Sequence, residues 1–261
     1  MRQSAIIIRT TAVKPLKEKK AMTNNHKPFG LIAAIAILVM ALAAGFAYGY
    51  VHSSLLAADA PTTVRNIQAS PGLLLAGILA WVVVLVCDLV VCWALYLYFK
   101  QVHRALSLLS SGLRLLYSGW LAVAIVQLAY IFPFVNNTNP VAGLVMHQFL
   151  AFEQIWSAGL IIFGLHLLCW AYLSLQSRNI PPIFGWLLVL AGWSYLLVHS
   201  GKWLFPGWLL VDQLETVLSL PMAAGELAFA FRMLIRSRYT AQPAYHLDKD
   251  EVKQIHRLEK I

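Results

Sequence analysis

Six long apolar runs constrain this chain more than any other feature of its sequence. About 20 apolar residues suffice for a helix to cross the hydrocarbon core of a bilayer. The backbone in lipid must satisfy its own hydrogen bonds, and the runs lack the two-residue alternation of barrel strands, so each run predicts a membrane helix. The predicted fold is all-α, a polytopic membrane protein built as a six-transmembrane-helix bundle. The runs cover residues 29–51, 73–99, 105–134, 148–176, 182–205 and 215–236.

The composition supports this class and excludes others. Of 261 residues, 60% are hydrophobic and only 12% are charged, about half the charged share of a soluble domain. These figures exclude soluble globular, disordered, coiled-coil and disulfide-framework proteins. The cysteines Cys87, Cys92 and Cys169 lie inside apolar runs and lack the spacing of metal ligands, which predicts packed free thiols. The sequence predicts no metal site and no cofactor.

The net charge of +9 comes mostly from one end of the chain. Residues 1–28 hold seven Lys and Arg residues against Glu18, which accounts for +6. We therefore divide the chain into a basic cytoplasmic N-terminal tail (1–28), a transmembrane domain (29–236) and a cytoplasmic C-terminal tail (237–261). No basic patch with interleaved aromatic residues is present, so the expected partner is the lipid bilayer and no nucleic acid.

The distribution of Lys and Arg between the runs predicts the orientation. Basic residues occur before the first run, in the second connection (Lys100, Arg104), in the fourth (Arg178) and after the last run, while the other three connections are poor in them. Because short cytoplasmic loops are enriched in Lys and Arg, both termini are predicted to be cytoplasmic. The first run is too long for a signal peptide and is taken as a retained helix. Whether residues 1–21 belong to the native protein or precede a start at Met22 is left open.

Four ionisable residues lie deep inside the predicted helices: Asp88, Arg114, His166 and Glu226. Each is 10 or 11 residues from the cytoplasmic end of its run, or about 15 Å at the rise of an α-helix. A charge in hydrocarbon is costly unless it faces the bundle and finds a partner. We therefore expect the four side chains to meet in one polar cluster near the membrane midplane.

Two interpretations of the polar cluster remain open. It is either a buried ionic network that fixes helix register, or the wall of a cavity for a small or lipidic ligand. On the second interpretation, the first hypothesis is a protein that binds or senses such a ligand. The alternatives are an intramembrane enzyme that uses His166 with Glu226 or Asp88 as acid–base groups, and a small transporter with Glu226 or Asp88 as its proton-coupled carboxylate. The sequence decides neither turnover nor oligomeric state.

A second set of polar residues lies near the outer ends of the fourth and fifth runs. Glu153, His199 and Lys202 form this set. We expect headgroup water to solvate them, and mutual pairing is the less favoured alternative. Sequence motifs of metallopeptidases, nucleotide-binding loops and serine hydrolases are absent, and no internal repeat is visible.

Several short motifs, in order, make the chain resemble a known family. The motifs are Asp59–Ile67, Ala94–Tyr96, Leu113–Leu115, Phe163–His166, Ser177–Pro181, Gly185, Ala191–Gly192 with Tyr195, and Gly225–Leu227. With them the chain is similar to the bacterial membrane family catalogued as domain of unknown function 4386, over about residues 27–237. The resemblance implies a six-helix bacterial inner-membrane protein and no particular activity. Arg114, His166 and Glu226 fall within its motifs.

The resemblance also draws attention to Asp59, Thr62 and Asn66 in the first outer connection. Asp, Thr and Asn side chains commonly bond to nearby backbone groups. We therefore expect these residues to cap the loop, in preference to forming part of an outer mouth.

Overall fold

The computed structural model describes residues 27–135 and 141–239 of the chain. Within these residues the secondary structure is helical and no strand occurs. The helices are α2 (Lys27–Ala44), η1 (Gly45–His52), α3 (Ser53–Leu55), α4 (Ala60–Ala69), α5 (Pro71–Phe99), α6 (Arg104–Ala129), α7 (Ile131–Val135), α8 (Ala142–Gln176), α9 (Pro182–Leu204) and α10 (Leu209–Tyr239).

Six helical stretches among the described residues are long and apolar enough to cross a membrane. This confirms the predicted class, a multi-pass all-α membrane protein with six long helices. The sidedness of the termini stays a prediction. Most of the predicted C-terminal tail (237–261) and residues 1–21 lie outside the described residues.

Two helices begin earlier than their apolar runs predicted. α8 begins at Ala142 instead of residue 148, and α10 begins at Leu209 instead of residue 215. The 35 residues of α8 measure about 52 Å at 1.5 Å per residue, longer than the roughly 30 Å core of a bilayer. A helix therefore continues beyond the hydrocarbon, where polar side chains are no longer excluded, and hydropathy alone underestimates its length.

The first membrane helix contains a wide turn. The π-helical segment η1 continues α2 and leads into α3, so residues 28–55 form one helical span. Tyr48 and His52 project from this segment toward α8, where Tyr48 packs against Trp156 and His52 bonds to Glu153. π-helical turns in helices are frequent at functional sites.

The connection between the first two membrane helices contains the short helix α4. The Asp59 side chain accepts a hydrogen bond of 2.9 Å from the Thr62 N–H and so caps α4, with Pro61 in its first turn. Asn66 Nδ2 donates to the Leu55 carbonyl at 3.2 Å and ties α4 to α3. The expected cap is confirmed for Asp59 and Asn66, whereas the Thr62 hydroxyl accepts a bond from the Arg65 side chain and not from the backbone. The Thr62 N–H bond holds the pKa of the Asp59 carboxyl below its usual value, with a smaller contribution from Arg65.

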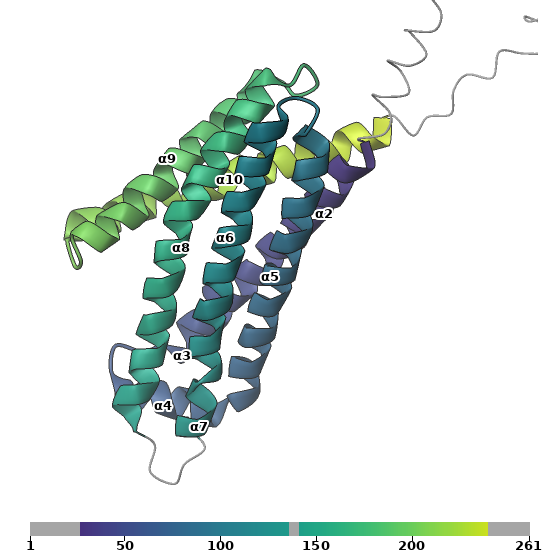
Figure 1. The fold of residues 1–261 in the computed structure, drawn as a ribbon. Helices are drawn as coiled ribbons and strands as arrows, with labels where there is room; N and C mark the ends of the chain where they lie inside the picture. Colours follow the sequence, from purple (N-terminus) through teal and green to yellow (C-terminus); the bar gives the residue numbers. More distant parts are fainter. Residues whose placement is uncertain (1–26, 136–140, 240–261) are drawn as a thin grey trace, which may run out of the picture.

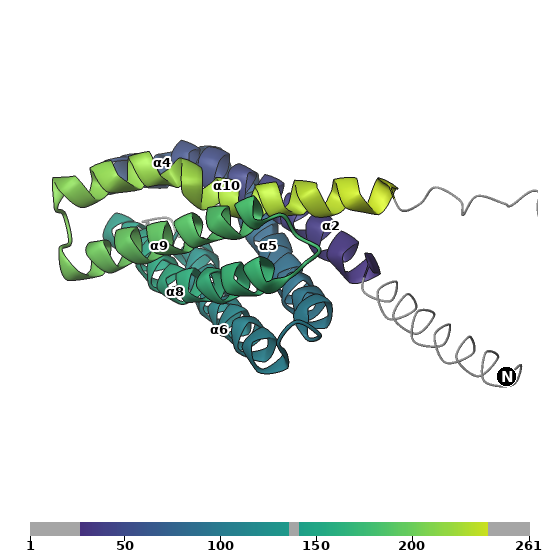
Figure 2. The ribbon, with the colours of Figure 1, turned by 90° about the horizontal axis from the view of Figure 1, so that it is seen from above.

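The six long helices pack as a closed ring of neighbours. α2 contacts α5, then α5 contacts α6, α6 contacts α8, α8 contacts α9, α9 contacts α10, and α10 returns to α2. Figure 1 shows α5, α6 and α8 side by side, with α9 and α10 inclined to them, and Figure 2 shows α10 beside α9 and α2. The ring has an interior reached by side chains from every long helix.

Small residues allow the closest helix contacts in this ring. A Cβ added at Gly225 of α10 would lie 2.7 Å from the Ala191 Cβ and 3.1 Å from the Leu187 carbonyl oxygen of α9. Gly164 of α8 faces the Gly192 carbonyl of α9 in the same way, at 3.0 Å. Small residues are typical of helix interfaces in lipid because they let backbones approach closely.

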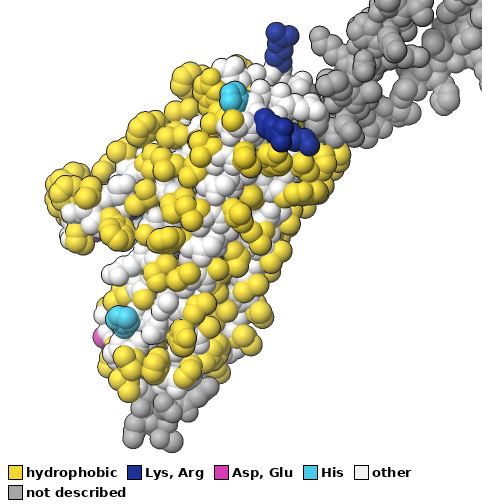
Figure 3. All heavy atoms as spheres, viewed as in Figure 1, with side chains coloured by type: hydrophobic (Ala, Val, Ile, Leu, Met, Phe, Trp, Pro, Cys, Tyr) yellow, Lys and Arg dark blue, Asp and Glu magenta, His cyan; other side chains and the backbone are white. Residues whose placement is uncertain are grey.

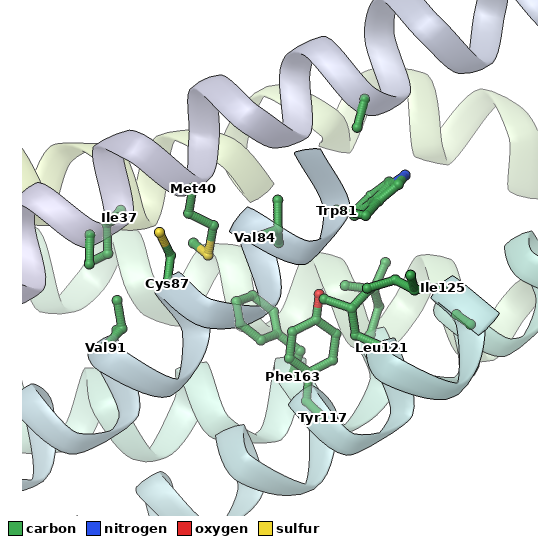
Figure 4. Packing of buried hydrophobic residues seen from close by; sticks show 14 of the residues in the cluster. Ile37, Met40, Trp81, Val84, Cys87, Val91, Tyr117, Leu121, Ile125 and Phe163 are labelled. Carbon is green, nitrogen blue, oxygen red and sulfur yellow. The ribbon is translucent and has the colours of Figure 1, made fainter. Parts of the chain in front are cut away.

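The outer surface of the bundle is that of a lipid-facing protein. Figure 3 shows hydrophobic side chains along the length of one face, with Lys and Arg gathered at the end near the tails. Inside, buried apolar residues from α2, α5, α6 and α8 pack against one another, as Figure 4 shows for Ile37, Val91 and Leu121 among others. The three cysteines are free thiols, as predicted.

Candidate functional site

Arg114 of α6 lies at the centre of the ring interior and is fully buried. Its Nε and Nη2 donate to the same oxygen of Asp88 on α5, Oδ1, at 2.9 and 2.6 Å. Nη1 donates to Glu226 Oε1 of α10 at 3.2 Å. The guanidinium also lies over the Phe163 ring, 5.2 Å from its centroid, and Nη2 points to Met40 Sδ at 3.6 Å.

His166 of α8 completes the polar cluster. Its Nε2 lies 3.2 Å from Arg114 Nη1. Because a guanidinium nitrogen can only donate, Nε2 accepts this hydrogen bond. Its Nδ1 lies 2.8 Å from the Ser110 carbonyl oxygen and therefore carries the proton that donates there. The geometry thus fixes a neutral imidazole. The structure brings all four predicted residues together through direct contacts with Arg114.

The buried face of α6 carries several serines as well as Arg114. Ser107 Oγ donates to the Tyr96 carbonyl, Ser111 Oγ to the Cys92 carbonyl and Ser118 Oγ to the Arg114 carbonyl. These serine side chains are short, and their hydroxyl groups donate hydrogen bonds to backbone carbonyl oxygens. They allow α6 to pack closely against α5 while Arg114 reaches the ring interior.

The polar cluster is short of positive charge. With His166 neutral, it holds one guanidinium and two carboxyl groups. Asp88 is fully buried, yet its Oδ2 has no hydrogen-bond partner among the described residues. A buried acceptor without a partner costs free energy, so this oxygen marks a place where the polar cluster is incomplete.

A cavity of about 280 Å³ borders the two carboxylates, and we call it the central cavity. Figure 4 shows Met40, Trp81, Val84, Tyr117 and Phe163, which line it, converging from four helices. It is bounded by α2, α5, α6, α8, α9 and α10. The other lining residues are Ile37, Ala41, Ala44, Asp88, Trp156, Leu160, Tyr195, Met222, Ala223, Glu226 and Leu227.

The lining of the central cavity includes only part of the polar cluster. Asp88 and Glu226 face it, whereas Arg114 and His166 are not among its lining residues. His166 is hydrogen-bonded to Arg114 and Ser110, and it makes no hydrogen bond to Asp88 or Glu226. A molecule in the cavity therefore meets two carboxylates and aromatic rings, with the cation and the imidazole behind them.

Aromatic side chains fill the bundle on the side of the polar cluster nearer the tails. Phe99, Trp170 and Phe229 are each 1% exposed or less, and the Trp170 and Phe229 rings are 4.6 Å apart. The Trp170 ring also packs against His166 at 5.7 Å. In this conformation the central cavity is separated from that end of the bundle by a layer of rings.

A second cavity of about 340 Å³, the outer pocket, lies at the opposite side. Glu153, His199 and Lys202 all line it, together with Tyr48, Gln154, Trp156, Ser157, Trp203, Pro206 and Glu215. Trp156 lines both cavities, and its Nε1 donates to the Tyr117 hydroxyl at 3.3 Å. One indole therefore stands between the outer pocket and the central cavity.

The predicted outer set is gathered in one pocket, but its members pair with other residues. Glu153 bonds to His52 at 3.0 Å, Lys202 to Glu215 at 2.7 Å, and His199 Nδ1 to Ser157 Oγ at 2.8 Å. The three residues do not pair with one another, which was the less favoured alternative, and their solvation by headgroup water stays a prediction. His52, which lies 101 residues before Glu153, and Glu215, which follows Lys202 by 13 residues, were not expected as partners.

Sequence reasoning also missed the aromatic walls of the central cavity. Trp81, Tyr117, Trp156 and Tyr195 carry no charge and look like ordinary membrane-helix residues. Their shared cavity depends on how six helices are arranged, and periodicity in one helix does not report that. Within the described residues, no three His, Cys, Asp or Glu side chains meet in a way that would hold a metal ion.

Comparison with known proteins identifies the family. Residues 32–237 match the family described as Domain of unknown function (DUF4386). The chain belongs to this family. It is also similar to an uncharacterized protein of Archaeoglobus fulgidus, with 25% identity over 155 residues, which cover 59% of this chain and 80% of that protein. No solved structure matches the chain.

The family match covers the whole ring of long helices, the polar cluster and both cavities. The match assigns the chain to the DUF4386 family, whose description names no ligand or reaction. The function must therefore be argued from the cavity itself.

Proposed function

We propose that this DUF4386 protein binds or senses a small or lipidic ligand in the central cavity. The observation that carries the proposal is the position of Asp88 and Glu226, two buried carboxyl groups on the wall of an otherwise apolar cavity. Binding sites for small molecules are mostly apolar concavities with a few polar groups that orient the ligand. In the membrane, an ionisable residue inside a helix bundle points to a functional site.

The geometry favours binding over acid–base catalysis. A general base must reach the proton it removes, and here His166 lies behind Arg114 with both ring nitrogens engaged. It favours binding over transport because the layer of Phe99, Trp170 and Phe229 closes the bundle on the side of the tails. We further propose that the protein resides in a bacterial inner membrane with both termini in the cytoplasm, as the charge distribution and the family resemblance indicate.

The central cavity can be filled without touching the polar cluster. Ala41 of α2 lines the cavity, whereas its neighbour Leu42 is 77% exposed and faces outward. Ala41→Phe is expected to occupy the cavity, and Leu42→Phe adds a similar ring on the lipid side as the matched control. Native mass spectrometry of protein released directly from its membrane should detect a bound non-protein mass that Ala41→Phe loses and Leu42→Phe keeps. The same bound masses in both variants would count against the proposal.

A further inference from the structure

We propose that the central cavity selects a cation, and that the ligand carries an organic ammonium group held by Asp88 and Glu226. This rests on the proposed function, because it names the chemical class of ligand for the same cavity. Three features of the cavity support it: the carboxyl groups on its wall, its aromatic rings and the scarcity of oxygen ligands.

The wall of the central cavity carries two carboxyl groups, which share the single guanidinium of Arg114. Asp88 Oδ1 is occupied by two bonds from Arg114, whereas the buried Oδ2 has no partner among the described residues. Glu226 shares a single 3.2 Å bond with Arg114 and is 8% exposed. Arg114 already serves both carboxylates and does not line the cavity, so an incoming anion would meet the carboxylates first.

Aromatic rings share the central cavity with the two carboxylates. Trp81, Tyr117, Trp156, Phe163 and Tyr195 line it. The negative faces of aromatic rings attract cations, and quaternary ammonium groups are recognised by such cages. The Arg114 guanidinium lies 5.2 Å from the centroid of the Phe163 ring, so one of these rings already makes a cation–π contact.

The remaining walls argue for an organic cation instead of a metal ion. Ile37, Leu160, Met222 and Leu227 give the cavity apolar sides. Hard metal ions need six or more oxygen ligands, or waters that replace them. Two carboxylates among apolar and aromatic side chains suit an organic ammonium group, because its carbon substituents are favourably transferred from water to an apolar cavity.

Two probes of the same shape test the inference. Benzyltrimethylammonium and neopentylbenzene differ in having nitrogen or carbon at the branched centre, and so differ in charge but little in shape. Binding is measured by titration calorimetry on the full chain in nanodiscs, with empty nanodiscs subtracted. We expect the ammonium to bind at least tenfold more tightly, a difference of about 1.4 kcal/mol.

Variants identify the source of the preference. Glu226→Gln keeps the shape of the side chain and leaves Asp88 to pair with Arg114, and we expect it to reduce the preference for the ammonium several-fold. Glu215→Gln makes the same change on the same helix outside the central cavity and should leave the preference as it is. Ala41→Phe should abolish the binding of both probes.

The outcomes separate the two proposals. If neopentylbenzene binds as tightly as the ammonium and Ala41→Phe removes both, the cavity binds ligands but the cation inference is wrong, as it would be if one carboxyl group held a proton. If both probes bind equally well to wild type and to Ala41→Phe, or if neither binds, the proposed function fails as well. A preference that survives in Glu226→Gln would overturn the role of that carboxylate.

Discussion

Arg114 distributes its hydrogen bonds unequally between its two carboxylate partners. Asp88 accepts two short bonds and is fully buried, while Glu226 accepts one longer bond and is slightly exposed. Removing one partner of a buried ion pair leaves an uncompensated charge, which is more costly than the pair is stabilising. At the residue scale, Asp88 is therefore the counter-ion of Arg114, and Glu226 is the additional negative charge.

This inequality predicts the order of two substitutions. Asp88→Asn should lower the free energy of unfolding by about 1.5–3 kcal/mol, because Arg114 loses its two short charge-assisted bonds to a carboxylate and keeps only the longer bond to Glu226. Glu226→Gln should cost about 1 kcal/mol or less, because Arg114 keeps Asp88 and the polar cluster becomes neutral. Thermal unfolding in one detergent measures both.

A surface pair provides the reference for this comparison. Glu215→Gln breaks the partly exposed bond to Lys202, and such pairs contribute about 0–1 kcal/mol. Equal losses for Asp88→Asn and Glu226→Gln would show that the two carboxylates share the guanidinium evenly.

Asp59 links the stability of α4 to pH. Its carboxylate accepts the Thr62 N–H bond, and this bond lowers its pKa in the folded protein. A group with a lowered folded pKa contributes stability that is complete above the ordinary aspartate pKa of about 3.9 and is lost as pH falls through the lowered value. We expect the α4 amides to lose hydrogen-exchange protection, relative to intrinsic rates, on acidification from neutral pH to below this range.

Asp59→Asn is the control for the pH effect. Asparagine also caps helices but does not titrate in this range, so the protection of α4 should become independent of pH. Parallel loss of protection in wild type and variant would assign the acid sensitivity to another group.

At the scale of helices, the contact between α9 and α10 depends on a missing side chain. A Cβ added at Gly225 would meet the Ala191 Cβ and the Leu187 backbone, and neither of these groups can rotate away. Gly119 on α6 is also helical but has nothing within 4 Å of an added Cβ.

Alanine at the two glycines is therefore expected to have opposite effects. Gly225→Ala should lower the unfolding temperature because α10 must move away from α9, and overpacking of this kind costs about 1–3 kcal/mol. Gly119→Ala should leave that temperature unchanged or raise it, since Ala favours a helix by about 1 kcal/mol over Gly. An unchanged Gly225→Ala protein would mean that the two helices separate freely.

The helices themselves were largely predictable from sequence. Continuous hydropathy gave their number, order and approximate ranges, because lipid forces each apolar run to close its own hydrogen bonds. The ends were less predictable: α8 and α10 extend six residues before their apolar runs, where water or headgroups accept polar side chains. The π-helical turn η1 left no sequence signal that we recognised.

At the scale of the whole molecule, Trp156 stands between two cavities. It lines both the outer pocket and the central cavity and packs against Tyr48 and Trp81. If a ligand reaches Asp88 and Glu226 through the outer pocket, this indole must move aside.

Truncating the indole should therefore speed exchange. Trp156→Ala is expected to raise both association and dissociation rates of benzyltrimethylammonium, measured by stopped-flow mixing with nanodiscs. Trp203→Ala, which changes only the outer pocket, is the control. Unchanged rates in Trp156→Ala would point to entry from the lipid between helices.

The orientation of the bundle gives a further prediction. Basic residues in alternate connections predict that both termini lie in the cytoplasm. Alkaline phosphatase, which is active only outside, should be inactive when fused after residue 239 and active when fused after Ala57. The reverse pattern would invert the assignment of inner and outer sides.

The sequence by itself determined the class, the number of helices and the four residues of the polar cluster. It did so because burying a charge in lipid is so costly that such residues stand out by depth alone. It did not determine which of these four residues face the cavity. Only the tertiary structure placed Arg114 and His166 behind the wall and left Asp88 and Glu226 facing a cavity, because that depends on which helices become neighbours in a closed ring. For the same reason the aromatic walls of the central cavity and the pairing of His52 with Glu153 appeared only in three dimensions, because they join side chains from helices far apart along the chain.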